Sequence, residues 1–346
     1  MKKSFLMFGV AAMALVSCTQ NEVVEYAENR AIQFDTFVNN NTRAEGVEVT
    51  AANIENFWVY GAYNNTSSWV PALTNVQVER SGSEAPYTWT PKELAYWETN
   101  KSYNFAAYAN GKTGLVDASK VSYEAASNKL TFTNYSAGTN DLVATTVSGK
   151  SWNGEGTPAA VALTFKHMLS KVMFTFKTNA SKDYTMKVTN LQIDNTAIQT
   201  ATGTLTGEDI SWPTSGTNGA YTYDVIGDYA DGTQGADGYF SKTSVARYVI
   251  PQTNTALTAS FTVSVYDASS AETPLYTKPF TGVSLNYTAS TGKGTAGEWT
   301  EGMVYNYIAV INPDQLDSNA KPIQFTVTTV DSWTPADDNT VGQPQP

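Results

Sequence analysis

The chain is poor in the residues that metal centres and disulfide scaffolds require. Its 346 residues include one cysteine and one histidine. Zinc fingers and iron–sulfur clusters take several cysteine or histidine ligands, and a disulfide takes two cysteines. The composition excludes these sites, and we expect a protein without catalytic residues, metal or cofactor.

Basic residues are also scarce. The sequence has 21 lysines and arginines against 32 aspartates and glutamates, which gives a formal net charge of −11. Nucleic-acid-binding surfaces need positive charge to neutralise the phosphate backbone, so this balance argues against a nucleic-acid partner. Aromatic residues make up 12% of the chain, more than a disordered chain carries, so we expect a folded protein.

Long apolar runs are missing as well. Phe5 to Val16 form an apolar stretch, which is too short to span about 30 Å of hydrocarbon as a helix, and no other segment could do so. Two lysines precede this stretch and Ser17-Cys18 follows it, which resembles the signal of bacterial lipoproteins. We expect residues 1–17 to be a signal peptide, cleaved between Ser17 and Cys18, with a lipid on Cys18. The alternative is an ordinary secretory signal followed by a chance cysteine.

What the chain does have is alternation of apolar and polar residues. Runs with a period of two, rich in Val, Thr, Tyr and Phe, are separated by clusters of Gly, Asn, Pro and Ser, and we find no helical pattern of three turns. This pattern predicts an all-β fold built from sandwiches. The clearest runs are Phe57 to Tyr63, Tyr103 to Ala109, Val172 to Lys177, Leu257 to Tyr266 and Tyr305 to Ile311.

A polar stretch over residues 151–158 predicts the boundary between two sandwiches. We expect an N-terminal sandwich over residues 44–155, a C-terminal one over 156–333, and a loose polar tail over 334–346. The tether between the signal and the first sandwich, residues 18–43, contains one island of alternation, in which Ile32, Phe34, Thr36 and Val38 fall on one face of a strand.

Three patterns are weighed as sites of chemistry and interpreted as structural. Ala106 to Thr113 loosely match a phosphate-binding loop, but their first half lies in an expected strand, which favours a β-turn. His167 shares a strand face with apolar residues, which favours a hydrogen-bonded structural role. The Asp228 to Gly238 stretch lacks the spacing of a calcium loop, which favours a turn.

Tryptophans in loop-like contexts leave a second function open. Trp69, Trp152 and Trp212 each lie beside turn-forming residues. An exposed aromatic face can stack on a sugar ring, whereas a tryptophan folded back over the end of a sandwich is structural. The alternative function is therefore a monomeric, outer-membrane surface lipoprotein that binds glycans through exposed tryptophans such as Trp69 or Trp152.

Arg43 lies in the most protease-accessible stretch of the chain, an asparagine-rich loop before the first sandwich. It is read either as a cleavage site or as an ordinary solvated arginine.

Taken together, these features resemble the fimbrillin family, the pilins of type V pili in Gram-negative anaerobes. The resemblance extends over nearly the whole chain and depends on the order and spacing of its elements. They include the lipoprotein signal, Ile32-x-Phe34, Thr42-Arg43-Ala44, Phe57-x-Val59, Asp141-Leu142, Leu163-x-Phe165-x-His167 and Ile323-x-Phe325-x-Val327.

The resemblance implies two transthyretin-like β-sandwiches in tandem, exported as a lipoprotein to the outer membrane. It implies that an arginine-specific protease cuts after Arg43 and leaves Ala44 as the new terminus. Removal of residues 18–43, with the plug strand of Ile32, Phe34 and Val38, would empty a groove for a strand from another subunit of a cell-surface fimbria that supports adhesion.

The donor strand is left open at this stage. Ile323, Phe325 and Val327 are the candidate donor residues, because Ile323-Gln324-Phe325 repeats Ile32-Gln33-Phe34. The same segment reads equally as the last strand of the C-terminal sandwich, in which case the tail must donate. The tail alternates poorly, and a subunit that accepts a strand without donating one suits a tip position, whereas a shaft subunit needs both.

Overall fold

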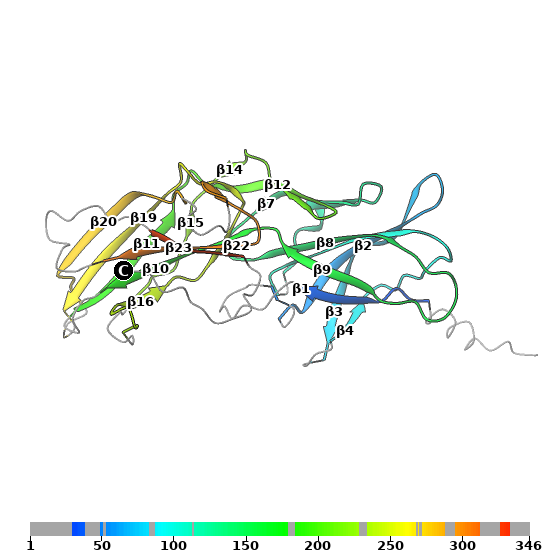
Figure 1. The fold of residues 1–346 in the computed structure, drawn as a ribbon, viewed down its shortest axis with the longest axis horizontal. Helices are drawn as coiled ribbons and strands as arrows, with labels where there is room; N and C mark the ends of the chain where they lie inside the picture. Colours follow the sequence, from blue (N-terminus) through cyan, green and yellow to red (C-terminus); the bar gives the residue numbers. More distant parts are fainter. Residues whose placement is uncertain are drawn as a thin grey trace, which may run out of the picture.

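The computed structural model shows an elongated molecule made almost wholly of strands (Figure 1). Within the residues it describes, the single helical element is a short 3₁₀ turn at Ala118–Lys120, so the all-β prediction is confirmed. No helix among the described residues is long and apolar enough to cross a membrane. The described residues are 30–38, 49–50, 53–82, 87–112, 114–178, 184–227, 234–267, 269, 272–287, 295–311 and 326–332.

The first half of the molecule is built on a seven-stranded sheet. Neighbouring strands are antiparallel except for the pair β1 and β9, which run parallel. In spatial order the strands are β1 (Phe34–Val38), β9 (Val161–His167), β8 (Leu142–Lys150), β5 (Tyr103–Asn110), β2 (Asn56–Asn64), β3 (Trp69–Ser81) and β4 (Thr88–Pro91).

Both faces of the central strands of this sheet are buried. Phe57 and Val59 of β2 belong to one hydrophobic core, which we call the first core. Trp58 and Tyr60 of the same strand belong to a second core. Side chains alternate between the faces of a strand, so β2 must be apolar at consecutive positions to fill both cores. The continuous run from Phe57 to Tyr60 is the sequence expression of this double burial.

A second sheet joins the two halves of the chain. Its strands are ordered β13-β12-β7-β6, with β14 also paired to β12. β7 precedes the expected domain boundary and β12 follows it, and the two pair along most of their length. The bounds are β6 (Val121–Glu124), β7 (Lys129–Ser136), β12 (Ile198–Thr206), β13 (Asp209–Ser211) and β14 (Thr217–Asn218).

The far half of the molecule is a sandwich of two sheets, ordered β16-β10-β22-β23 and β15-β11-β19-β20. β17 also pairs with β10, and β18 with β21. The two sheets share one core, in which Phe176 and Phe261 meet with ring centroids 5.1 Å apart. The bounds are β10 (Ser170–Thr178), β11 (Tyr184–Ile193), β15 (Tyr221–Thr222), β16 (Phe240–Thr243), β17 (Arg247–Val249), β18 (Gln252–Thr253), β19 (Thr258–Asp267), β20 (Tyr276–Ser284), β21 (Glu298–Trp299), β22 (Met303–Val310) and β23 (Thr326–Ser332).

The boundary expected after residue 155 falls between β8 and β9, which are neighbours in the seven-stranded sheet. The apolar face of β9, formed by Val161, Leu163 and Phe165, is buried in the first core. Strands from beyond that boundary therefore complete both sheets of the first half. The alternation in β9 predicts a strand but does not specify which core the strand fills.

The chain passes into the far half at Met168 and Leu169, whose side chains are fully buried. The Met168 carbonyl accepts a hydrogen bond from the Trp212 indole N–H at 2.7 Å, and the Leu169 carbonyl accepts one from the Gly302 N–H at 2.9 Å. The Met168 N–H donates to the Leu142 carbonyl at 2.8 Å. This crossover is held from both halves rather than left as a free linker.

Candidate functional site

The segment from Arg30 to Val38 lies at the edge of the seven-stranded sheet, beside β9 (Figure 1). β1 runs parallel to β9, with Phe34 opposite Val161 and Val38 opposite Phe165. The ladder continues one step before β1, because the Val161 N–H donates to the Gln33 carbonyl at 2.8 Å. The backbone of β1 therefore satisfies the free edge of β9.

The other side of the same segment is also paired. Ala31 forms an antiparallel bridge with Tyr96. The Ile32 N–H donates to the Ala95 carbonyl at 2.9 Å, and the Trp97 N–H donates to the Arg30 carbonyl at 3.0 Å. Residues 30–38 thus connect β9, near one end of the seven-stranded sheet, with the segment that follows β4, the strand at the other end.

The side chains of this segment fill the first core. Ile32 is 1% exposed and Phe34 is 2% exposed, whereas Gln33 and Asp35 between and after them face solvent. The Phe34 ring packs edge-on against Phe57 at 6.1 Å and against Phe105 at 6.0 Å. Burial of a side chain of this size stabilises the fold by roughly 1.5–3 kcal/mol.

Two of the three residues expected to plug a groove, Ile32 and Phe34, are therefore buried in the first core. For Val38 the structure gives the pairing of its backbone with Phe165, but its side chain lies outside the description. Without this segment, the edge of β9, the Ala95 carbonyl and the Trp97 N–H would lose their partners. An open edge above an uncovered apolar core is a surface that accepts another strand.

The next described residue after Val38 is Val49, which is fully buried. The Val49 N–H donates to the Asp141 carboxylate at 3.0 Å, and the His167 Nδ1 lies 2.9 Å from the same oxygen. The Asp141 side chain is itself buried, and its backbone carbonyl accepts a bond from the Gly111 N–H at 2.7 Å. We refer to Val49, Asp141 and His167 as the buried clamp.

The buried clamp gives His167 the hydrogen-bonded structural role that the sequence favours. Residue chemistry does not predict Asp141 as its partner, because the two residues are 26 positions apart and a lone aspartate before a strand carries no pairing signal. The resemblance includes Asp141 only as part of a dipeptide. Arg43 and Ala44 lie outside the described residues, as do Ser17 and Cys18.

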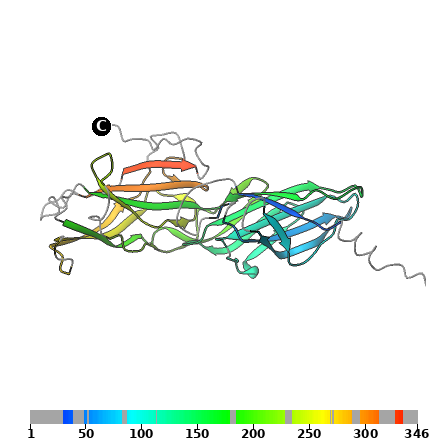
Figure 2. The ribbon, with the colours of Figure 1, turned by 90° about the horizontal axis from the view of Figure 1, so that it is seen from below.

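The candidate donor segment ends in β23, an edge strand antiparallel to β22, with Val327 opposite Tyr307 and Val330 opposite Tyr305. Ile323 and Phe325 lie outside the described residues. The described part of the segment thus pairs within its own sandwich, in line with one of the two readings left open. Figure 2 shows β1 in blue and β23 in red, in opposite halves of the molecule.

Trp152 is not the exposed aromatic face that the glycan-binding alternative requires. It is 8% exposed within the first core, and its indole N–H donates to the Glu155 carbonyl at 3.0 Å. The tryptophan folds back because the end of the first core would otherwise be open to water. Trp69 begins β3 and is half-buried, and Trp212 is half-buried at the crossover.

The patterns weighed for phosphate and calcium are used structurally where they are described. Residues 106–110 belong to β5, and Gly111 turns the chain with φ of 70°. Asp237 pairs with Lys177 at 2.7 Å, while Asp228 and Asp231 lie outside the description. Among the described residues, no three His, Cys, Asp or Glu side chains are grouped to hold a metal ion.

The fold defines a class of molecule. It is an elongated all-β protein, and a strand from its own amino-terminal segment completes its first sheet. The sequence pattern of fimbrillin-like proteins matches residues 42–333, so the chain belongs to the fimbrillin-like family.

Two fimbrial proteins are among the solved structures that match the chain. A fimbrial protein from Bacteroides vulgatus is 15% identical with a TM-score of 0.54, over 88% of this chain and 100% of that one. The fimbrial anchor protein Mfa2 from Porphyromonas gingivalis is 9% identical with a TM-score of 0.34, over 88% of this chain and 98% of that one. No curated protein matches the chain.

Proposed function

We propose that this protein is a structural subunit, shaft or tip, of a cell-surface fimbria, and that it polymerises by strand exchange at the groove that residues 30–38 occupy. The observation that carries the proposal is the double attachment of this segment, to β9 on one side and to residues 95–97 on the other, with Ile32 and Phe34 buried beneath it. A strand with these contacts holds an acceptor site closed until it is removed.

The processing steps belong to the same proposal. The signal peptide is cut between Ser17 and Cys18, and acyl chains on Cys18 hold the precursor at the outer membrane. A single acyl chain binds a membrane only marginally, whereas several hold a protein stably. An arginine-specific protease then cuts after Arg43. This cut frees the molecule from its lipid and allows residues 18–43 to leave the groove.

The groove offers an incoming strand both a backbone ladder and apolar pockets. Each apolar side chain that replaces Ile32 or Phe34 gains roughly 1.5–3 kcal/mol from burial, and ordering the donor and the lost freedom of the two molecules offset part of this gain. Several such side chains on one donor strand are therefore needed for a stable joint.

The donor that we favour is the segment containing Ile323, Phe325 and Val327. Its described part, β23, has one neighbour in its sheet, so a single backbone ladder, the one to β22, must break for the strand to leave. If β23 stays in place, the tail over residues 334–346 has to donate instead.

The experiment that tests the proposal is amino-terminal sequencing of the cell-surface protein, with Arg43→Ala beside the wild type. We expect the wild type to begin at Ala44 and to form polymers, and Arg43→Ala to remain lipidated at Cys18 and monomeric. Arg80→Lys, a change at an arginine in β3, is the matched control and should behave as wild type. Polymers built from Arg43→Ala subunits would contradict the proposal.

A further inference from the structure

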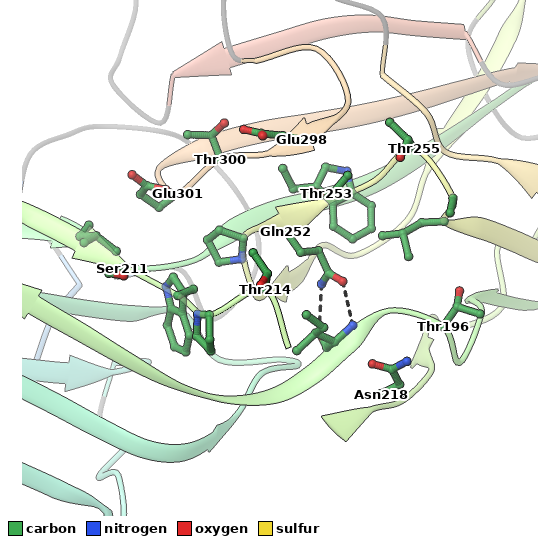
Figure 3. A pocket seen from close by; sticks show the side chains of 18 residues that line it. Thr196, Ser211, Thr214, Asn218, Gln252, Thr253, Thr255, Glu298, Thr300 and Glu301 are labelled. Atoms are coloured by element: carbon green, nitrogen blue, oxygen red, sulfur yellow. Dashed lines mark hydrogen bonds between the residues drawn. The ribbon is translucent and has the colours of Figure 1, made fainter. Parts of the chain in front are cut away.

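A groove of about 550 Å³ lies beside the crossover, between the β12–β13–β14 strands and the β18–β21 pair (Figure 3). Its volume is within the range of ordinary small-molecule sites, roughly 300–1,000 Å³. The groove involves neither β1, β9 nor β23, so strand exchange does not use it.

One wall of the groove is a fixed aromatic surface. The half-buried Trp212 lines it, and its indole N–H is held by the Met168 carbonyl at 2.7 Å. The six-membered ring of Trp212 lies over Gly203, where a Cβ atom would come within 2.6 Å of the ring. Tyr135 packs nearby with ring centroids 6.1 Å apart. The indole is therefore preorganised and does not need to be ordered by a ligand.

The floor of the groove is equally fixed. The Gln252 side chain accepts a hydrogen bond from the Ile198 N–H at 2.8 Å and donates to the Ile198 carbonyl at 3.0 Å (Figure 3). The Gln252 amide thus pairs with the backbone of Ile198 as a neighbouring strand would, and it links β18 to β12. Gln252 therefore shapes the site rather than offering free hydrogen-bonding groups.

The remaining polar side chains around the groove are available to a ligand. Glu298 and Glu301 lie on the segment that leads into β22, whereas Ser211, Thr214 and Asn218 come from the β12–β14 side (Figure 3). None of these five side chains forms a hydrogen bond or ion pair with another residue that the structure describes. Among the described residues, no lysine, arginine or histidine lines the groove.

We propose that this groove binds a neutral carbohydrate. The apolar face of a sugar ring stacks on an indole, sugar hydroxyls donate to carboxylates, and hydroxyl and amide groups serve the remaining sugar oxygens. An acidic lining without a cation disfavours sialylated or sulfated sugars. A cationic peptide could also pair with the two glutamates, but it would not use the hydroxyl groups of Ser211 and Thr214.

The test uses the purified full chain on an array of galactose-, N-acetylglucosamine- and mannose-terminated oligosaccharides, with sialylated and sulfated counterparts, followed by calorimetric titration of the best binder. We expect binding to a neutral oligosaccharide and a loss of about tenfold or more in affinity for Glu298→Gln/Glu301→Gln, because charge-assisted hydrogen bonds are weakened. Trp212→Ala should also lose affinity. The glutamine pair carries the test, because Trp212 additionally supports the crossover.

Two controls separate the groove from the rest of the surface. Glu79→Gln and Trp69→Ala, both on β3, should leave binding unchanged. Failure to bind any neutral oligosaccharide, or equal binding by the glutamine pair and wild type, would overturn the proposal. Equal affinity for sialylated sugars, or binding of a lysine-rich peptide in their place, would overturn it as well.

Discussion

Phe34 shows how much of the first core depends on a single side chain from outside the main body of the sheet. Its ring contacts Phe57 of β2 and Phe105 of β5, which are neighbouring strands at the centre of the sheet. A ring removed from such a position leaves a cavity lined by other rings, which the surrounding strands cannot fill without moving.

We therefore expect Phe34→Ala to lower the free energy of unfolding of the full chain by about 3–5 kcal/mol. Urea unfolding followed by tryptophan fluorescence measures the change. Asp35→Ala, at the exposed neighbouring position on β1, is the matched control and should change stability little. Equal midpoints for the two variants would mean that β1 does not close the core in solution.

The buried clamp acts on the segment that follows the proposed cleavage site. Asp141→Ala leaves the Val49 N–H and the His167 ring without their carboxylate partner, so we expect a loss of roughly 3 kcal/mol in stability. Asp141→Asn retains an oxygen for Val49 and should lose less. Hydrogen exchange at the Val49 amide should be fast only in the alanine variant; continued protection there would contradict this role of Asp141.

Buried tyrosines give the first half a sensitivity to high pH. Burial raises the pKa of Tyr60 and of Tyr103 from 10.0 to about 12. In the unfolded chain these phenols release their protons near pH 10, so between pH 10 and 12 the unfolded state holds fewer protons than the folded state. The free energy of unfolding therefore falls as pH rises through this window and is unaffected by these groups below it.

Denaturant titrations at pH 9, 10, 11 and 12 measure this loss of stability. Tyr60→Phe keeps the ring and removes the titrating hydroxyl, so its stability should fall less steeply across the window, although the hydrogen bond to the Val121 carbonyl is lost at every pH. Parallel curves for Tyr60→Phe and wild type would rule Tyr60 out as a source of the effect.

At the scale of elements, β1 and β23 are the two strands that the proposed assembly sets in motion, and both lie at sheet edges. β1 carries Phe34 into the first core, and the described attachment of β23 is its ladder to β22. Exchange of one for the other requires that β23 be released without loss of its own sandwich.

A disulfide between β22 and β23 tests this requirement. Val304 and Asp331 are directly opposite in the antiparallel pair, at a separation that a disulfide can bridge. We expect oxidised Val304→Cys/Asp331→Cys to fold and to stop polymerising, and a reductant to restore polymers. Cys18 is the sole native cysteine and precedes the proposed cut, so no other thiol competes. Polymerisation of the locked form would assign the donor role to residues 334–346.

At the scale of the whole molecule, the sequence predicts the kind of fold better than its partition. The alternating run from Val161 and the continuous apolar run from Phe57 are local patterns, and both predict strands correctly. The pairing of β12 with β7, and of residues 30–32 with 95–97, joins distant positions, and nothing in a period of two encodes the partner. Ile32 and Phe34 were identifiable because apolar residues alternate there within a polar tether.

The sequence predicts which side chains of the amino-terminal strand are buried, because alternation is a local pattern. It does not predict which strands or side chains they meet. Buried positions on a strand follow from alternation, whereas the parallel direction of β1 and the pairing of Asp141 with His167 depend on how distant strands meet. The tryptophans show the limit most directly, since Trp152 and Trp212 have similar turn-like neighbours but only Trp152 is fully covered.

The crossover at Met168 and Leu169 has a mechanical consequence. The backbone there is bonded to β8, to the Trp212 indole and to Gly302, and the pairing of β7 with β12 runs beside it along the length of the molecule (Figure 1). A tensile load along that axis is shared by hydrogen bonds in shear, which yield together rather than one at a time. In a filament of such units, bending would occur mainly at the contacts between molecules. The crossover within each molecule would stay rigid.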